Sequence, residues 1–261
     1  MSVSRLRPLF VAALLLLFAP AALADGALSL LDEILQRGTL RVGSTGDYKP
    51  FTYQNPETKG FEGIDIDMAA SLAKALGVKL EIVKTAWPNL MADFTAAKFD
   101  IAMGGVSVTL ERQKKGLFSI AYLVDGKSAI ARCADKEKFS SLAAIDKAET
   151  KAIVNPGGTN ERYARENLKQ AQIAVYQDNV TIFDQIVEGK ADVMITDASE
   201  TMLQQKLRPA LCAIHPDQPF NFAEKAYWLQ RDLAFKAFVD QWLHLALMTS
   251  EYQAISDKHL K

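Results

Sequence analysis

Short apolar runs alternate with amphipathic segments along the first half of the chain. Runs of four to seven residues such as "LRVGST" (40–45), "KLEIV" (79–83) and "FDIAMGG" (99–105) predict strands. Between them, "IDIDMAASLAKALG" (64–77) and "WPNLMADFTAAK" (87–98) carry apolar residues at helical spacing, and "TLERQKKGL" (109–117) begins another helix. Strands separated by helices predict βαβ units and largely parallel sheets.

The pattern restarts after a stretch at 119–133 that looks extended. "KAIVNPGGT" (151–159) predicts a strand and a loop, and a helix follows from about Asn160. "QIAVY" (172–176), "VTIFDQIVEG" (180–189) and "ADVMI" (191–195) predict strand, helix and strand, with a further helix beginning near Asp197. The segment 224–247 carries apolar residues at helical spacing.

Two such units predict an α/β protein with two lobes, each a mostly parallel sheet flanked by helices, and a ligand cleft between them. The extended segment around 122–130 forms one crossing between the lobes, and a second crossing is expected near 216–222. We therefore expect lobe 1 to comprise residues 25–125 plus 221–261, and lobe 2 residues 126–220. Ligands are expected at the carboxyl ends of the strands.

The first 24 residues have the features of a secretory signal peptide: a basic start, a short apolar core and a small-residue end before Asp25. This segment predicts export to the periplasm. No later apolar run is long enough to cross a membrane, so no membrane insertion is expected after the signal is removed. The formal net charge of -1 offers no basic face for nucleic acid.

The two cysteines, Cys133 and Cys212, are expected to form a disulfide, because thiols are oxidised in an exported protein. The alternative is two buried free thiols. The three histidines lack metal-ligand spacing, so a zinc site is not expected. Neither a phosphate-binding Gly-x-x-x-x-Gly-Lys loop nor a Gly-x-Ser-x-Gly nucleophile motif occurs, and no cofactor is predicted.

Several motifs, in order, resemble one family over nearly all of the mature chain. "GDYKPF", "GFEGIDIDMAASLAKALG", "FDIAMGGVSVTLERQKKGLFS", "GGTNE" and "ADVMITDA" are similar to those of periplasmic binding proteins that deliver polar amino acids to transporters. Within that fold, "WPNLMADF", "DGKSAI", "DNVTIF" and "FAEKAYWL" resemble the exported cyclohexadienyl dehydratases. The resemblance implies a type II periplasmic-binding-protein fold, a reaction that converts prephenate to phenylpyruvate and arogenate to phenylalanine, and a trimeric homo-oligomer.

The resemblance also implies roles for individual residues. Arg112 is the position that grips the ligand carboxylate, and its planar guanidinium suits a carboxylate's two oxygens. Ser107 and Thr109 would complete that site, although Thr109 could instead cap a helix. Asp197 is the position that meets a ligand ammonium in the amino-acid-binding relatives.

Glu200 is the general acid that the resemblance implies. Residues at i and i+3 share a helix face, so Glu200 could point into the same cleft as Asp197. The two acids also fit an ordinary capping box, in which Asp197 caps the helix and Glu200 bonds back to its N–H. Residues alone do not choose between these two interpretations.

Prephenate carries two carboxylates and therefore needs a second site beyond Arg112. The Gly157–Gly158 loop could expose N–H groups at a helix N-terminus. Further substrate-binding candidates come from the same motifs: Lys127, Asn155, Thr159, Asn160 and Asp47. Thr159 could instead cap a helix, and Lys127 could be a solvated charge at the hinge. Tyr48, Phe51 and Trp87 could form an aromatic surface for the ring, or belong to the core.

Two functions remain open. One is a dehydratase that uses general-acid-assisted, decarboxylative loss of water; the other is a non-catalytic amino-acid-binding component of an ABC transporter. Both share the fold, the signal peptide and the cleft. A sensor or adhesion module has no supporting segment in the sequence.

Overall fold

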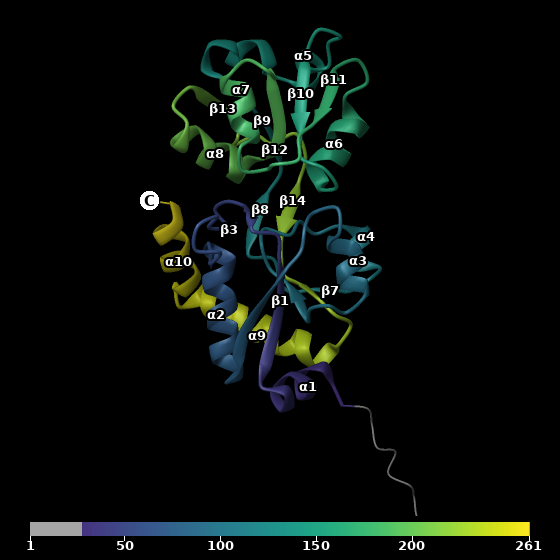
Figure 1. Ribbon diagram of the computed structural model, residues 1–261, viewed down its shortest axis with the longest axis vertical. Helices are drawn as coiled ribbons and strands as arrows, with labels where there is room; N and C mark the ends of the chain where they lie inside the picture. Colours follow the sequence, from purple (N-terminus) through teal and green to yellow (C-terminus); the bar gives the residue numbers. More distant parts are fainter. Residues whose placement is uncertain (1–27, 261) are drawn as a thin grey trace, which may run out of the picture.

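The computed structural model describes residues 28–260, so the predicted signal peptide lies outside the described residues. Figure 1 shows two lobes that follow one another along the longest axis, each built on a sheet with helices around it. Lobe 1 carries both the first and the last described elements, and lobe 2 is formed by the middle of the chain.

The sheet of lobe 1 has five strands. In spatial order they are β5 (Lys79–Lys84), β1 (Thr39–Ser44), β6 (Ile101–Ala102), β15 (Trp228–Leu229) and β7 (Leu117–Phe118). Its helices are α1 (Leu30–Arg37), α2 (Ile64–Leu76), α3 (Leu90–Thr95), α4 (Leu110–Gln113), α9 (Leu233–Met248) and α10 (Glu251–Leu260). β1 pairs in parallel with β5 and β6, whereas β15 is antiparallel to β6 and β7.

The sheet of lobe 2 also has five strands. Their spatial order is β11 (Gln172–Val175), β10 (Lys151–Val154), β12 (Val193–Asp197), β9 (Lys127–Arg132) and β13 (Leu211–Ile214). Its helical segments are η1 (Cys133–Phe139), α5 (Leu142–Ile145), α6 (Thr159–Asn167), α7 (Ile182–Val187) and α8 (Ala198–Leu207). β10 is parallel to β11 and β12, and β9 is antiparallel to β12 and β13.

Both sheets are therefore mixed, with parallel and antiparallel pairs in equal number. The expectation of mostly parallel sheets held only for the βαβ part of each lobe, because the strands next to the crossings enter from the other lobe and run the opposite way. A small sheet of β2 (Asp47–Tyr48), β3 (Thr52–Gln54) and β4 (Phe61–Glu62), which the pattern did not predict, lies beside α2.

Two antiparallel strands carry the chain between the lobes: β8 (Leu123–Asp125) and β14 (Ala223–Lys225). β8 leads directly into β9 through Gly126, and β14 follows β13 on the way back to lobe 1. The exact lobe boundaries, 125/126 and 220/221, stay a prediction.

Each lobe buries apolar side chains on both faces of its sheet. In β12, Val193 and Ile195 pack with η1, α5 and α6, while Met194 between them packs with α7 on the other face. This follows from the strand period of two, and a strand covered on both faces reads as a continuous apolar run. The apolar run of "ADVMI" (191–195) is therefore typical of a strand that is buried on both faces.

The prediction for 224–247 was wrong over its first residues. Helix α9 begins only at Leu233, and Trp228–Leu229 form strand β15 between β6 and β7. Tyr227, Trp228 and Leu229 are fully buried. A short apolar run inserted between two strands has no local signature that separates it from a buried helix.

Cys133 and Cys212 are joined by a disulfide, with an S–S distance of 2.06 Å. It links the end of β9 to β13, at the edge of the lobe 2 sheet. None of the helices between residues 28 and 260 has the length and apolar character that crossing a lipid bilayer requires.

Candidate functional site

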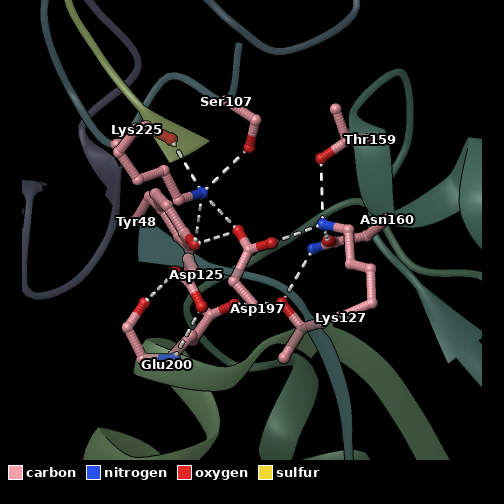
Figure 2. Close-up of polar contacts among 12 residues, drawn as sticks. Tyr48, Ser107, Asp125, Lys127, Thr159, Asn160, Asp197, Glu200 and Lys225 are labelled. Carbon is pink, nitrogen blue, oxygen red and sulfur yellow. Dashed lines mark hydrogen bonds and ion pairs between the residues drawn. The ribbon is translucent and has the colours of Figure 1, made fainter. Parts of the chain in front are cut away.

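Asp197 stands at the carboxyl end of β12, where the two lobes meet. Only 3% of its surface is exposed. Its Oδ1 accepts a hydrogen bond from the Lys127 ammonium at 2.6 Å, and its Oδ2 accepts one from Lys225 at 2.5 Å and another from the Tyr48 hydroxyl. Figure 2 shows the carboxylate between the two lysines. A ligand ammonium would have to compete with two ammonium groups already in place.

Lys225, the last residue of β14, is a site residue that sequence reasoning missed, as are Thr196 and Asn179. Its side chain is completely buried, and besides Asp197 it donates to Ser107 Oγ at 3.0 Å and to the Gly105 carbonyl at 3.1 Å. The only available signal was its place in "FAEKAYWL", a motif noted for its resemblance. Nothing local distinguishes this lysine from a solvated one, because its partners are distant in the chain.

Lys127, the first residue of β9, is 3% exposed, so the alternative of a solvated hinge charge is wrong. Its ammonium also donates to Thr159 Oγ1 at 2.9 Å and to Asn160 Oδ1. Thr159 does not cap its helix, since the N-cap of α6 is Gly158. Three predicted binding residues of lobe 2 therefore meet around one ammonium group.

The ion pairs set the protonation of this cluster. Burial alone would raise the pKa of Asp197, but the charges of Lys127 and Lys225 outweigh it and hold that pKa well below its usual range. Burial lowers the pKa of Lys127, against the effect of Asp197. Burial, and then the charge of Asp197, raises the pKa of Tyr48 well above its usual value, so its hydroxyl keeps its proton.

Glu200 lies in the first turn of α8 and is 1% exposed. Burial raises its pKa to about 8, and the charge of Asp197 acts in the same direction, while the Thr196 hydroxyl and the two lysines oppose it. The side chain does not reach back to the backbone of Asp197, and Asp197 makes no capping bond. The capping-box alternative is therefore wrong.

A chain of hydrogen bonds connects Glu200 to the lysine cluster. Thr196 Oγ1 donates to Glu200 Oε2 at 2.5 Å and accepts from Asn160 Nδ2 at 2.9 Å. The same Asn160 amide donates to Asn155 Oδ1 at 3.1 Å and accepts from Lys127. Asn155 and Asn160 thus support the site through its hydrogen-bond network.

The aromatic candidates divide between site and core. Tyr48 and Trp87 meet edge to face, with ring centroids 5.7 Å apart, and Trp87 Nε1 donates to Asp47 Oδ1 at 3.0 Å. Phe51 is 1% exposed and belongs to the lobe 1 core, which is the alternative that the sequence left open for it. Burial raises the pKa of Asp47, against its hydrogen bond from Trp87.

Arg112 is buried but points to a different space from the lysines. Its Nη1 donates to the Ser107 carbonyl at 2.8 Å, and burial lowers its pKa to about 10, so it stays charged at neutral pH. Thr109 caps α4 by accepting from the Arg112 N–H at 3.2 Å, as its alternative predicted. Only Ser107 of this group reaches the inner cluster, through Lys225.

Several spaces adjoin the cluster, two of them on the side of Trp87. An inner cavity of about 20 Å³ lies among the side chains around Asp197 and Lys225, and an outer groove of about 510 Å³ lies between α3–α4 and α6. Trp87, Gly158 and Thr159 line both, and Arg112 lines the groove. The inner cavity has room for little more than one water molecule, so the lobes must part to admit a larger ligand.

Comparison with known proteins places this arrangement in a family. Residues 40–261 match the bacterial extracellular solute-binding proteins, family 3. The chain belongs to this family. Contact of Asp197 with a ligand stays a prediction.

Within family 3, the chain is 60% identical over 218 residues to a cyclohexadienyl dehydratase of Pseudomonas aeruginosa, covering 84% of this chain and 81% of that protein. It is 30% identical over 169 residues to the L-cystine-binding protein TcyJ of Escherichia coli, covering 64% of this chain and 62% of that protein. The family thus includes both an enzyme and binding proteins.

Two solved structures extend the comparison. AncCDT-1, described as an ancestral amino acid-binding protein and a precursor of cyclohexadienyl dehydratase, superposes with a TM-score of 0.82 at 35% identity, over 89% of this chain and all of that one. The ancestral cyclohexadienyl dehydratase AncCDT-3 is 51% identical with a TM-score of 0.57, over 90% of this chain and 97% of that one.

Proposed function

We propose that this protein is a cyclohexadienyl dehydratase, a carbon–oxygen lyase that converts prephenate to phenylpyruvate and arogenate to phenylalanine. The relative that is 60% identical over most of both chains supports the proposal. The family and the predicted signal segment support a periplasmic location. The trimeric state stays a prediction from resemblance.

The observation that carries the proposal is the burial of Glu200 one turn from Asp197, which raises the pKa of Glu200. A ligand-binding protein has no need for a carboxylic acid that keeps its proton at neutral pH, whereas a general acid requires one. Glu200 is buried, its pKa is raised to about 8, and it lies one turn from Asp197. Asp197 itself is held ionised by its two lysines.

The reaction removes the ring carboxylate and the ring hydroxyl together. The bond between the ring carbon and its carboxylate breaks, carbon dioxide leaves, and the electron pair moves into the ring. The carbon–oxygen bond to the hydroxyl breaks as Glu200 transfers its proton to that oxygen, so the group leaves as water and Glu200 becomes a carboxylate. Formation of the aromatic ring drives the step.

Other residues of the chain orient the substrate. Arg112, charged and facing the outer groove, holds the carboxylate of the side chain that is retained in the product. Trp87, which lines both spaces, offers a face for the six-membered ring. Closing the lobes around the substrate excludes water and keeps Glu200 buried. The mechanism requires no cofactor.

The experiment that tests the function is an assay of the purified mature protein. Incubation with prephenate should yield phenylpyruvate, measured by its absorbance in alkali, and the dehydratase is rejected if no product forms. The likeness to an amino acid-binding protein names the alternative. Tight binding of an amino acid by calorimetry, together with no turnover, would establish the transport function instead.

A further inference from the structure

Asn179, in the loop between β11 and α7, reaches across the cleft with a side chain that is only half satisfied. It is 4% exposed, and its Nδ2 donates to the main-chain carbonyl of Asp47 in lobe 1 at 3.0 Å. Its Oδ1 is buried and has no hydrogen-bond partner among the described residues. A buried acceptor without a donor is costly unless a ligand or water supplies one.

The orientation of the Asn179 amide is fixed by its loop and by its hydrogen bond to Asp47. Asp178 accepts from the Val180 N–H at 2.9 Å and from the Thr181 hydroxyl at 2.8 Å, which holds the loop in place. Rotating the amide by half a turn would set Oδ1 against the carbonyl oxygen of Asp47 and lose the hydrogen bond. The oxygen therefore has to remain the free end of the amide.

Asn179 lines the inner cavity beside Asp197 and Lys225. The other side-chain oxygens that line this cavity, within the described part of the chain, each accept a hydrogen bond already. They belong to Tyr48, Ser107, Asn155, Thr159, Asn160 and Asp197. Among the described side-chain oxygens that line the cavity, Oδ1 of Asn179 is thus the one that receives no hydrogen bond.

The two substrates of the proposed reaction differ in one group: arogenate has an ammonium where prephenate has a keto oxygen. An ammonium needs an acceptor, and each oxygen of Asp197 already accepts a hydrogen bond from a lysine ammonium, which repels a third cation. The ring hydroxyl is common to both substrates and has to reach Glu200, which is not among the residues that line this cavity. A keto oxygen would face Oδ1 as acceptor against acceptor.

On the basis of the proposed function, we infer that Asn179 is a specificity-determining residue whose Oδ1 accepts a hydrogen bond from the ammonium of arogenate. It favours the amino substrate over the keto substrate, because a site built to bond a donor rejects the analogue that lacks it. It also connects the two lobes, through its hydrogen bond to the Asp47 carbonyl.

The test compares kcat/KM for arogenate and prephenate in the wild type and in Asn179→Leu, which keeps the shape of the side chain and removes the acceptor. The ratio of arogenate to prephenate should fall roughly tenfold or more, the worth of one hydrogen bond to a charged group. Loss of the bond to Asp47 lowers both values together and leaves the ratio unchanged. An unchanged ratio overturns the inference.

Asn155→Leu is the matched control. Asn155 is a buried asparagine of the same cavity, but its Oδ1 is already bonded to Asn160. Its replacement should lower turnover of both substrates without moving their ratio, and an equal change of the ratio in this control would also overturn the inference. If Asn179→Leu fails to fold, Asn179→Ala removes the same acceptor without added bulk.

A binding measurement separates this inference from the proposed function. Should the wild type turn over neither substrate, the function is rejected, and calorimetry with phenylalanine and phenylpyruvate still compares an ammonium with a keto group. Asn179→Leu should then weaken phenylalanine roughly tenfold and leave phenylpyruvate unchanged. Equal weakening of both ligands, or of neither, overturns the role of Asn179.

Discussion

At the scale of single residues, two acids one turn apart have opposite protonation states because their partners differ. Asp197 has two lysines within 2.6 Å, whereas Glu200 has one hydroxyl group and the negative charge of Asp197 nearby. Burial acts on both carboxyls, and the ion pairs decide the outcome. In the proposed mechanism, this difference makes Asp197 an ionised anchor and Glu200 the proton donor.

The pKa of Glu200 predicts how turnover depends on pH. Because the proton donor is lost as pH rises through about 8, kcat with prephenate should be constant below that value and fall above it. A pH–rate profile measures this directly. A kcat that keeps rising from pH 7 to pH 9 would contradict the assignment of Glu200 as the acid.

The free energy of unfolding should also depend on the pKa of Glu200. The folded-state pKa of Glu200 is raised from 4.5 to about 8, so its contribution to stability is fully present below 4.5 and is lost as pH rises through 8. The free energy of unfolding of the wild type should therefore fall relative to that of Glu200→Gln, which stays neutral, as pH rises over that interval in urea titrations. A difference independent of pH would mean that Glu200 is ionised throughout.

Lys225→Met tests whether Lys225, which the sequence did not predict, stabilises Asp197. It removes one of two cations from a buried carboxylate, and breaking a buried pair costs about 3 kcal/mol or more. Lys190→Met is the control, because Lys190 pairs with Glu188 on the surface and such pairs contribute about 1 kcal/mol at most. Equal free energies of unfolding for the two variants would show that Lys225 does not stabilise Asp197.

At the scale of elements, β9 joins the site to the disulfide. It begins at Lys127 in the cluster and ends beside Cys133, about 20 Å away at the rise of an extended strand. Replacing Cys133 and Cys212 by alanine should lower the free energy of unfolding by about 2–4 kcal/mol and leave kcat/KM unchanged at 25 °C. Thermal unfolding and the prephenate assay measure the two effects.

A reducing agent provides the control for this prediction. It should lower the midpoint of thermal unfolding of the wild type and have no further effect on the double alanine variant. A parallel fall of kcat/KM and stability in the double variant would show that the bond orients Lys127 as well as stabilising lobe 2.

Elements with long periodic patterns were predictable, and short inserted ones were not. The apolar period places α2, β12 and α8 close to their observed bounds. β15 and the strands of the small sheet have two or three residues each, and they are strands because of partners elsewhere in the chain. Lys225 was missed for the same reason: Asp197, Ser107 and Tyr48 reach it only through the fold.

At the scale of the molecule, the two lobes are held together by few direct contacts outside the lysine cluster. Arg162 of lobe 2 pairs with Glu111 of lobe 1 at 2.7 Å, and Asn179 bonds to the Asp47 carbonyl. Gly157, with a φ of +75°, lies against Pro88 of lobe 1, and a Cβ there would be 2.5 Å from Pro88 Cα. Closure of the two lobes thus depends on a glycine at position 157, where they meet.

Gly157→Ala should therefore lower kcat/KM by opposing closure. Gly189→Ala is a matched control: its φ is +73°, but a Cβ there meets nothing within 4 Å. Both changes carry the left-handed backbone cost of about 1–2 kcal/mol, so their free energies of unfolding should fall alike. Equal kcat/KM values for the two variants would show that the approach of Gly157 to Pro88 is not needed for turnover.

We propose that Glu200 donates the proton that lets the ring hydroxyl leave as water. The most direct test is the rate of phenylpyruvate formation from prephenate by Glu200→Gln, with binding followed by calorimetry. Turnover should fall roughly a hundredfold or more, since general acids contribute at least that factor, while prephenate still binds. Turnover close to that of the wild type would remove Glu200 from the mechanism.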